Sequence, residues 1–433
     1  MQNREQATQL YNAAVAAVQP ANLIPQYIEL AADGIRIAGE HIQTNKQSVI
    51  VIGAGKAAAA MAQTTEAILG DFIKTGLIVT KYEHALPLRH IQLIEAAHPV
   101  PDEKSMEAVQ QTIQLLQQTQ PGDVIVCLIS GGASSLWADV PDGCNLQEVQ
   151  ETFQLLLKSG AAIDEMNCVR RHLSNIKGGQ LLRYAAHAKW FTLMISDVPG
   201  DKLEAIASGP TSADPTSFAD AWKIVEQYEL QQRLPAAVIT HLKNGLMGAV
   251  AETVKQHDPV LQQVQNHIIG SNKVALSAAA AKAKELGYTV MLQQELVTGD
   301  AAATASAIVQ QVKQYNGHKP ACFLYGGETT VIVTGNGKGG RNQHLALCAL
   351  QHLTPDDNIT LLAAGTDGTD GPTDAAGAFA DAAIVKAIDM NKSLLLESIR
   401  QNDAYHFFEN ANGLLKTGAT QTNVMDIIIV LLD

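Results

Sequence analysis

Short hydrophobic runs alternate with longer alanine- and leucine-rich segments from Ser48 onward, and this alternation restricts the fold more than any other feature of the chain. The runs SVIVI, GLIVT, DVIVCLIS and WFTLMIS are rich in β-branched residues, whereas the segments between them have the composition of helices. Strands that alternate with helices form βαβ units around a parallel sheet. The sequence therefore predicts an α/β protein whose first part contains a largely parallel sheet.

An interruption of this pattern indicates two domains. The chain has 433 residues, more than one hydrophobic core usually holds. Between Leu234 and Val264 the strand signals give way to a helical stretch with polar flanks, and a second α/β series then runs to the strand NVMDIIIVLL. We expect domains at residues 1–240 and 241–433. Because small-molecule sites often lie between domains, we expect the active site in the interdomain cleft.

Charge and composition exclude several classes of partner. The chain carries 30 Lys and Arg against 43 Asp and Glu, a formal charge of -13 that repels nucleic acid and anionic membranes. Its five cysteines lack CxxC spacing, no apolar run approaches the length of a membrane span, and the N-terminus does not resemble a secretory signal. We expect a cytoplasmic protein without nucleic-acid or membrane partners, in which an anionic ligand needs a local basic pocket.

The stretch GAGKA (residues 53–57) joins a hydrophobic strand to a helix of small residues. A dinucleotide fingerprint would need an acid at the end of the next strand, but GLIVT runs into Thr80-Lys81, and no Walker loop occurs in the chain. The N-terminus of a helix attracts anions, and Lys56 adds a full charge there. An anion site that includes Gly53, Gly55 and Lys56 and a simple strand-to-helix turn are both compatible with the stretch.

A second glycine-rich loop, SGGASS, follows the strand DVIVCLI directly. Its glycines let the backbone approach a ligand, and successive N–H groups with hydroxyls form a concave anion nest. A turn capped by serine is the alternative interpretation. The candidate binding residues in this loop are Ser130, Gly131, Gly132, Ser134 and Ser135.

The segment NCVRRHLSNIKGGQ places Arg170, Arg171, His172 and Lys177 in a short part of an acidic chain. A helix would spread these side chains around its circumference, so that one or two of them at most face one ligand. We select Lys177 as the binding residue.

Asp197 follows the strand WFTLMIS within the sequence SDVPGD. In an open α/β sheet, ligands bind outside the carboxyl ends of the strands. A carboxylate in that position could bind Mg²⁺ or take a proton from a substrate hydroxyl, and it could equally cap a turn. The sequence leaves these alternatives open.

Three polar and glycine-rich stretches dominate the second half of the chain. GGETT contains Glu328, and the four glycines of GNGKGG leave the backbone open to a ligand where Arg341 begins a helix. GTDGTDG offers two carboxylates three residues apart, without the later ligands of a calcium loop. The candidates for substrate or nucleotide binding, catalysis and metal binding here are Glu328, Gly339, Gly340, Arg341, Asn342, Asp367 and Asp370.

Neither a Ser-His-Asp order, a Cys-His pair nor an HExxH motif can be assembled from the chain, so hydrolysis by a nucleophile or by zinc has little support. The chain supplies instead anion-binding loops, isolated cations and carboxylates at strand ends. This set suits phosphoryl transfer, which depends on positioning and charge neutralisation.

The motifs GAGKA, HPVPD, SGGASSL, RRHLSNIKGG, SDVPGD, ASGPT, GGETTV, GKGGRNQ and GTDGTDG occur in this order over nearly the whole chain. Together they resemble the class II glycerate 2-kinases, which have an N-terminal glycerate kinase domain and a C-terminal MOFRL domain. The resemblance implies a Rossmann-like αβα sandwich followed by an α/β domain with a mixed sheet. It also implies ATP-dependent phosphorylation of the 2-hydroxyl of D-glycerate to 2-phosphoglycerate, with Mg²⁺ or another divalent cation.

The family's essential lysine and arginine fall on Lys56 and Arg341 of this sequence. We expect both to act on the transferring phosphoryl group or the substrate carboxylate. Asp197 is our candidate for orienting or deprotonating the 2-hydroxyl, with Asp367 and Asp370 as metal or nucleotide contacts.

Two other functions remain open at this stage. An NAD(P)-dependent hydroxypyruvate reductase, or a related hydroxy-acid oxidoreductase, would act on a similar substrate, but the missing strand-end acid and the extra lysine count against it. A sensor of sugar acids or nucleotides would bind without turnover. The sequence does not fix the oligomeric state, and a homodimer is compatible with it.

Overall fold

The computed structural model describes residues 2–44, 47–388 and 392–433, and its contacts divide the chain into two compact units. The N-terminal unit comprises Leu23–Ile269, and the C-terminal unit comprises Met1–Asn22 and Gly270–Asp433. The expected boundary after residue 240 lies within helix α9 of the N-terminal unit. The chain forms one more strand of the N-terminal sheet, β9, before it leaves that unit.

The N-terminal unit is built on a six-stranded sheet of order β6-β5-β4-β7-β8-β9. Pairing is parallel at the four contacts that join β6, β5, β4, β7 and β8. Counted along the chain from β4, this is the strand order of the Rossmann folds, so the predicted Rossmann-like sheet is confirmed. The strands are β4 (Val49–Ala54), β5 (Ile73–Lys81), β6 (Gln92–Ala96), β7 (Val124–Ile129), β8 (Lys189–Ile195) and β9 (Val264–Gly270).

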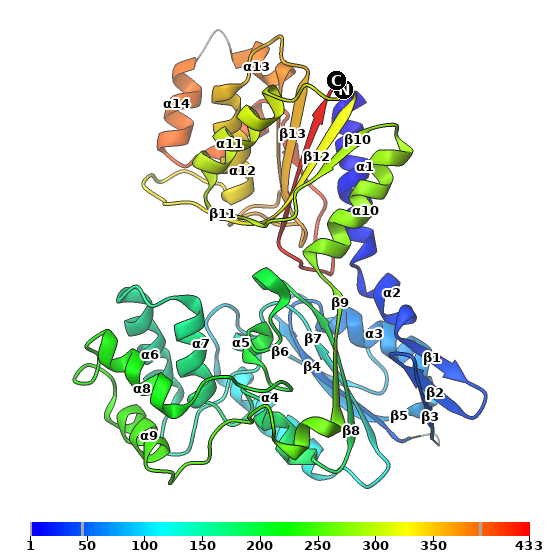
Figure 1. The fold of residues 1–433 in the computed structure, drawn as a ribbon, viewed down its shortest axis with the longest axis vertical. Coiled ribbons are helices and arrows are strands. Elements are labelled where there is room, and N and C mark those ends of the chain that lie inside the picture. Colours follow the sequence, from blue (N-terminus) through cyan, green and yellow to red (C-terminus); the bar gives the residue numbers. More distant parts are fainter. Residues whose placement is uncertain (1, 45–46, 389–391) are drawn as a thin grey trace. The chain divides into compact units, whose positions relative to one another are not determined.

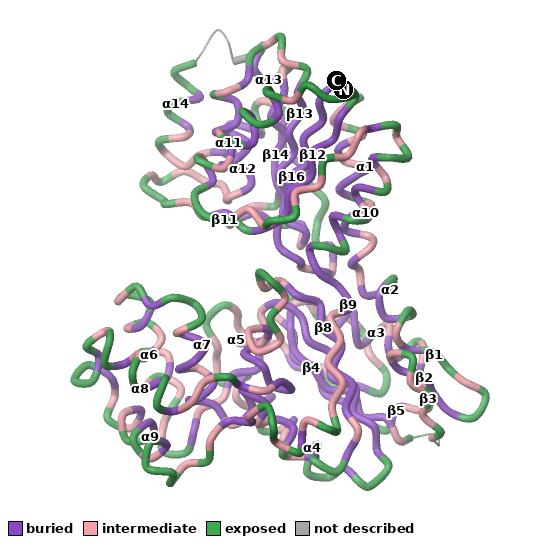
Figure 2. The backbone as a smooth tube through the Cα atoms, viewed as in Figure 1, coloured by how far each residue is buried: buried purple, intermediate pink, exposed green. Residues whose placement is uncertain are grey.

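Strands β4 and β7 are buried along their whole length, which explains why their sequences are continuously apolar rather than alternating. The core around them also receives side chains from the helices α4 and α5. Figure 2 shows the central strands of this sheet mostly in the colour of buried residues. A separate core joins α6 to α9, where Phe218 and Leu242 are buried. The helices are α3 (Ala58–Leu69), α4 (Glu103–Gln117), α5 (Ala133–Leu136), α6 (Leu146–Lys158), α7 (Ile163–His172), α8 (Phe218–Gln227) and α9 (Ala236–Leu246).

A small antiparallel sheet precedes β4 in the N-terminal unit. It follows the short helix α2 (Pro20–Leu23) and contains β1 (Ile28–Ala31), β2 (Gly34–Ile37) and β3 (Glu40–Gln43).

The C-terminal unit contains a mixed sheet of order β10-β12-β16-β13-β14-β15, with β11 paired to β12 (Figure 1). Strand β12 runs parallel to β10 and β11 but antiparallel to β16, and the pairs from β16 to β15 are antiparallel. The predicted mixed sheet is therefore confirmed. Its strands are β10 (Thr289–Leu292), β11 (Val297–Asp300), β12 (Ala321–Thr330), β13 (Ile359–Gly365), β14 (Gly377–Asp381), β15 (Leu414–Leu415) and β16 (Asp426–Leu432).

The first helix, α1 (Gln2–Ala17), belongs to the C-terminal unit although it begins the chain. It packs against α10, and the hydroxyl of its buried Tyr11 donates to the carbonyl oxygen of Gly365 at 2.8 Å. None of the described helices combines the length and hydrophobicity that crossing a bilayer requires. The other helices of this unit are α10 (Asn272–Glu285), α11 (Ala301–Lys313), α12 (Arg341–Ala349), α13 (Ala382–Ile388), α14 (Lys392–Arg400) and α15 (Ala404–Asn410).

Candidate active site

The first candidate region lies at the carboxyl ends of β4, β7 and β8. The register places Ala54 opposite Ile129 and Ile129 opposite Met194, so the three strands end level with one another. From β4 the chain adds strands on one side of the sheet, and from β7 it adds them on the other. Ligands of open α/β sheets bind at such a switch point. The loops that carry Lys56, SGGASS and Asp197 therefore share the edge where a ligand is expected.

The two glycine loops bind each other through their backbones. The N–H of Lys56 donates to the carbonyl oxygen of Gly131 at 2.9 Å, and the N–H of Ala57 donates to Ser130 Oγ at 3.0 Å. Gly55 has φ +138°, and a Cβ there would lie 2.2 Å from Ser130 Oγ and 2.5 Å from its carbonyl oxygen. Gly55 therefore permits the close approach of the two loops. The hydroxyl oxygen of Ser130 stabilises this arrangement because it accepts the N–H of Ala57.

Gly53 has a packing role within the sheet. A Cβ at this position would lie 2.0 Å from the carbonyl oxygen of Leu128 on the neighbouring strand. The residue is buried inside β4, and its glycine is explained by the close pairing of β4 with β7.

A cluster of basic side chains surrounds Gly132 at this edge. A Cβ on Gly132 would lie 3.0 Å from His98 Nε2 and 3.4 Å from Lys56 Cγ, so both side chains pass over the loop. Burial lowers the pKa of His98 to about 4, helped by the positive charges of Lys56, Lys81 and His84. An otherwise acidic chain thus concentrates positive potential where β4, β5 and β6 end.

Two members of this cluster, His98 and Lys81, are absent from the candidates chosen from sequence. Their positions at strand ends could have identified both residues, because Lys81 ends β5 and pairs with Ala96 at the end of β6, two residues before His98. In the sequence, Thr80-Lys81 stands where a dinucleotide-binding site would have an acidic residue. In the structure it is a cation that adds to the field around His98.

His98 is expected to make the protein less stable in acid. A histidine whose pKa is lowered on folding from 6.5 to about 4 stabilises the fold fully above pH 6.5, and this stability is lost as pH falls toward 4. The loss is at most about 1.4 kcal/mol per pH unit, reduced by solvent at this half-buried site. Thermal unfolding of wild type and His98→Gln from pH 8 to 4 measures it. Parallel curves for the two proteins would contradict the prediction.

A chain of hydrogen bonds leads from the SGGASS loop to Arg170. Ser134 Oγ lies 3.1 Å from Ser208 Oγ, Ser208 Oγ donates to Asn167 Oδ1 at 3.3 Å, and Arg170 Nη1 donates to the same oxygen at 2.6 Å. Ser208 and the preceding Ala207 both have positive φ values, +59° and +52°. Such strained backbone persists only where its surroundings hold it, and it is frequent at binding sites.

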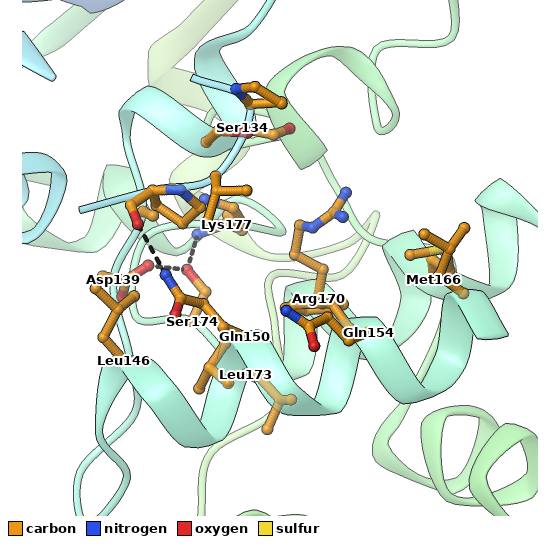
Figure 3. Close-up of a pocket in the computed structure, with 18 residues that line it drawn as sticks. Ser134, Asp139, Leu146, Gln150, Gln154, Met166, Arg170, Leu173, Ser174 and Lys177 are labelled. Atoms are coloured by element: carbon orange, nitrogen blue, oxygen red, sulfur yellow. Dashed lines mark hydrogen bonds between the residues drawn. The ribbon is translucent and has the colours of Figure 1, made fainter. Parts of the chain in front are cut away.

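The basic run of helix α7 and the following turn divides by position. Arg171 is buried and its Nε lies 2.8 Å from Asp214 Oδ1, whereas His172 is buried with its ring 4.7 Å from that of Phe218. Arg170 and Lys177 instead line a cavity of about 250 Å³ in the N-terminal unit (Figure 3). Ser134 and Ser135 of the glycine loop also line the cavity. Of the four basic residues in this run, Arg170 and Lys177 line it, which agrees with the prediction that one or two of them at most face one ligand.

Lys177 is almost fully buried, and its Nζ donates to the carbonyl oxygen of Trp137 at 2.7 Å. Burial lowers its pKa to about 8, with Asp139 acting in the opposite direction and Arg170 adding to the decrease. Asp139 in turn accepts hydrogen bonds from the Ser174 hydroxyl and the Asn175 N–H. Lys177 therefore stiffens the floor of the cavity as well as supplying charge.

Asp197 lies two residues beyond the end of β8 and is half-buried. Its position at the carboxyl edge of the sheet agrees with the placement of a group that acts on a ligand at the switch point.

The second candidate region surrounds Arg341, the first residue of α12. Its guanidinium donates from Nε and Nη2 to the two oxygens of Asp426 at 2.5 and 2.9 Å, and Nη1 lies 2.7 Å from Glu328 Oε1. Burial opposes its charge, but the hydrogen bonds to Asp426 and the charges of Asp426 and Glu328 raise the pKa of Arg341. The guanidinium is thus fixed in orientation and stays charged.

Asp370 occupies the N-terminus of α12. Its carboxylate accepts the N–H groups of Asn342 and Gln343 at 3.1 and 2.8 Å, and burial raises its pKa to about 6. A Cβ on Gly340 would lie 2.3 Å from Asp370 Cγ, and a Cβ on Gly371 would lie 2.3 Å from the carbonyl oxygen of Gly339. The helix N–H groups that the sequence offered to an oxyanion therefore bind Asp370, and these glycines accommodate that contact.

The carboxylates predicted as metal contacts in this region accept hydrogen bonds from protein groups. Asp367 accepts the N–H and hydroxyl of Thr369, both at 3.1 Å, and the oxygens of Asp370 and Asp426 bind α12 and Arg341. Across the part of the chain that the structure describes, no three His, Cys, Asp or Glu side chains meet in a way that could hold a metal ion.

Comparison with known proteins identifies the families and relatives to which the chain is similar. A family model described as "Domain of unknown function (DUF4147)" matches residues 6–243, and the model of the MOFRL family matches residues 321–426. A glycerate 2-kinase of Pyrococcus horikoshii is 39% identical, with 100% of this chain and 98% of the relative aligned. A protein of Agrobacterium vitis named putative hydroxypyruvate reductase is 36% identical, with 99% and 94% aligned.

The crystal structure of a glycerate kinase from Thermotoga maritima matches with a TM-score of 0.88 and 35% identity, covering 100% of both chains. The first family model spans more than half of this chain, and the Pyrococcus relative aligns with all of it. Together with the Rossmann-like unit and the mixed-sheet unit, these matches confirm the family predicted from the motifs: the chain belongs to the class II glycerate 2-kinases.

Proposed function

We propose that this chain transfers the γ-phosphoryl group of ATP to the 2-hydroxyl of D-glycerate and releases 2-phosphoglycerate and ADP. The observation that carries the proposal is the position of Lys56 beside Gly132 of the SGGASS loop, with the charge of Lys81 acting on the neighbouring His98, at the switch point of the sheet. Both substrates are anions. Phosphoryl transfer depends mainly on placing and neutralising such charges, which a rigid loop beside fixed cations does well.

In this proposal Lys56 neutralises the transferring phosphoryl group, while N–H groups of the SGGASS loop and the hydroxyls of Ser134 and Ser135 hold an anionic group of a substrate. Asp197, at the same edge of the sheet, orients or deprotonates the 2-hydroxyl. Arg341 binds a substrate or phosphoryl oxygen. Its partner Glu328 is exposed, so a substrate anion can replace that carboxylate while the buried Asp426 keeps the guanidinium in place.

The divalent cation belongs to the same proposal but not to a site of the protein's own. Mg²⁺ retains waters and often binds mainly to substrate phosphates. Because the described residues assemble no cation cluster, we expect the cation to enter bound to ATP. All five cysteines are free thiols, which agrees with the cytoplasmic location that we propose.

A nicotinamide-dependent activity has less support. In Rossmann folds an acid at the end of the second strand binds the ribose hydroxyls of the dinucleotide. Here that strand is β5, which ends in Lys81. A protonated lysine cannot accept hydrogen bonds from those hydroxyls, and its charge favours phosphate instead.

The test is incubation of the purified protein with D-glycerate, ATP and Mg²⁺, with phosphorus NMR to distinguish 2-phosphoglycerate from 3-phosphoglycerate. Reactions without ATP or with L-glycerate serve as controls. A parallel reaction contains hydroxypyruvate and NADH or NADPH. Formation of 2-phosphoglycerate is the expected result, whereas oxidation of the nicotinamide without any phosphorylated product would overturn the proposal.

Asp197→Asn is expected to lower kcat by about 10²- to 10⁴-fold, the contribution typical of a positioned general base. The KM for ATP should change little, because the substitution removes a proton acceptor and keeps the size of the side chain. The measurement is kcat against pH, in which the variant should lose the limb assigned to the base. Asp164→Asn, at an exposed position of α7, is the matched control. A variant with wild-type kcat and pH profile would show that Asp197 has only a structural role.

A further inference from the structure

We infer that the cavity of the N-terminal unit binds the adenosine part of the nucleotide, with Arg170 at the start of its phosphate chain; the inference rests on the proposed function. The cavity is lined by α6, α7, the HPVPD turn and the SGGASS loop, all within one unit. It assigns a location to the nucleotide base, which the glycine loops alone do not.

The walls of the cavity favour a purine over glycerate. Most of its lining side chains are apolar, among them Leu146, Val149 and Phe153 on α6 and Met166 and Leu173 on or beside α7. Glycerate carries a carboxylate or hydroxyl on each carbon and would leave these walls without a matching surface. A flat base with apolar faces fills such a cavity, because ligand sites are mainly hydrophobic with a few placed polar groups.

The polar groups of the cavity match the edge of adenine. Gln150 and Gln154 are four residues apart on α6 and therefore lie on the same face of the helix. Gln150 Nε2 donates to the carbonyl oxygen of Pro101 at 2.8 Å, which fixes its amide against the opposite wall (Figure 3). A glutamine amide pairs with the N6 amino group and N7 of adenine in other complexes.

Arg170 supplies the charge for the phosphates. Its guanidinium lies 4.7 Å from the centre of the Phe153 ring and donates to Asn167, but among the described residues no carboxylate lies within ion-pair distance of it. Its neighbour Arg171, by contrast, is paired with Asp214. A half-buried cation without a counter-ion is costly, and a guanidinium is well shaped to bind phosphate.

The position of Arg170 also gives the nucleotide a direction. Through Asn167 and Ser208 it is connected to Ser134 of the glycine loop. Lys56 lies beside Gly132 of the same loop. A nucleotide with its base between α6 and α7 would thus carry its phosphates past Arg170 and over the loop toward Lys56.

The test measures binding of ADP and adenosine by calorimetry in the absence of glycerate. Leu146→Trp fills the cavity and should weaken both ligands at least about 10-fold, which corresponds to 1.4 kcal/mol. Arg170→Met keeps the apolar stem and should weaken the binding of ADP about 10- to 100-fold, because a hydrogen bond to a charged phosphate is lost. The affinity for adenosine, which has no phosphate, should not change. Glu151→Trp, on the exposed side of α6, and Arg183→Met are matched controls.

Thermal unfolding of each variant confirms that it is folded, and KM values locate the effect when turnover is present. The expected pattern is a raised KM for ATP with an unchanged KM for D-glycerate. Wild-type affinity for ADP in both cavity variants, or a selective rise in the KM for D-glycerate, would overturn the inference. Failure of the proposed function is a different result, since wild-type protein would then form no phosphoglycerate whatever its affinity for ADP.

Discussion

Replacement of Lys56 by methionine is expected to lower kcat for phosphorylation of D-glycerate by about 10²- to 10³-fold, as does the loss of one preorganised group that stabilises transition-state charge. Methionine keeps most of the side-chain volume over Gly132 and removes the charge. The backbone N–H of Lys56, which binds Gly131, remains in the variant. The loop should therefore keep its shape, and the loss should appear in catalysis rather than in folding.

The measurement is steady-state kinetics of ADP formation together with thermal unfolding. The Tm should stay close to wild type, because methionine keeps most of the side-chain volume and the backbone hydrogen bond to Gly131 remains. Lys104→Met, at an exposed lysine on α4, is the matched control. Lys56→Arg adds information, because a guanidinium restores charge but not the compact shape of an ammonium. Turnover near wild type in Lys56→Met would remove Lys56 from the mechanism.

The loops around Lys56 were predictable from sequence because they directly follow continuously apolar strands. Such strands, here β4 and β7, mark the centre of a parallel sheet. The carboxyl ends of such strands meet at one edge, so Lys56 and Asp197 could be assigned to that edge before the structure was known. Local sequence patterns were therefore sufficient to place Lys56 and Asp197, whereas the contact between Gly55 and Ser130 depends on the tertiary fold.

Contacts between distant segments were not predictable in the same way. Helix α1 binds the C-terminal unit through Tyr11 and Gly365, which are separated by 354 positions in sequence, and no local pattern announces such a partner. The same limitation applies to Asp370, which resembled a metal ligand in the GTDGTDG loop. Its carboxylate is committed to the N-terminus of α12, a contact set by the tertiary fold.

Arg170 shows how a sequence argument can find a basic cluster without selecting every member that lines the cavity, because the sequence led to Lys177 alone. The helical repeat predicted that the four basic side chains of the RRHLSNIK run would point in different directions. Which of them reaches a ligand depends on where the carboxylates lie, and Asp214 comes from a segment more than forty residues away that neutralises Arg171. Arg170 lines the cavity, and no such partner reaches it among the described residues.

Arg341→Ala should reduce both stability and activity, and the two losses have different causes. Asp426 is almost fully buried, so removal of its partner leaves a carboxylate without compensation. Breaking such a pair costs about 3–5 kcal/mol, and we expect the lower end because the side chain of Arg341 is 36% exposed. The kcat should fall by about 10²- to 10³-fold through loss of the charge proposed to act on the substrates.

The double variant Arg341→Ala/Asp426→Asn separates these causes. Asparagine removes the uncompensated charge, so the free energy of unfolding should recover by about half or more of the loss, whereas kcat should stay as low as in Arg341→Ala. Asp426→Asn alone keeps the guanidinium but loosens its orientation, and should lower kcat less than Arg341→Ala does. Chemical denaturation and steady-state kinetics of ADP formation, measured on wild type, the two single variants and the double variant, complete the double-mutant cycle. Recovery of kcat together with stability in the double variant would assign Arg341 a structural role, because an activity that returns without the guanidinium cannot depend on its charge.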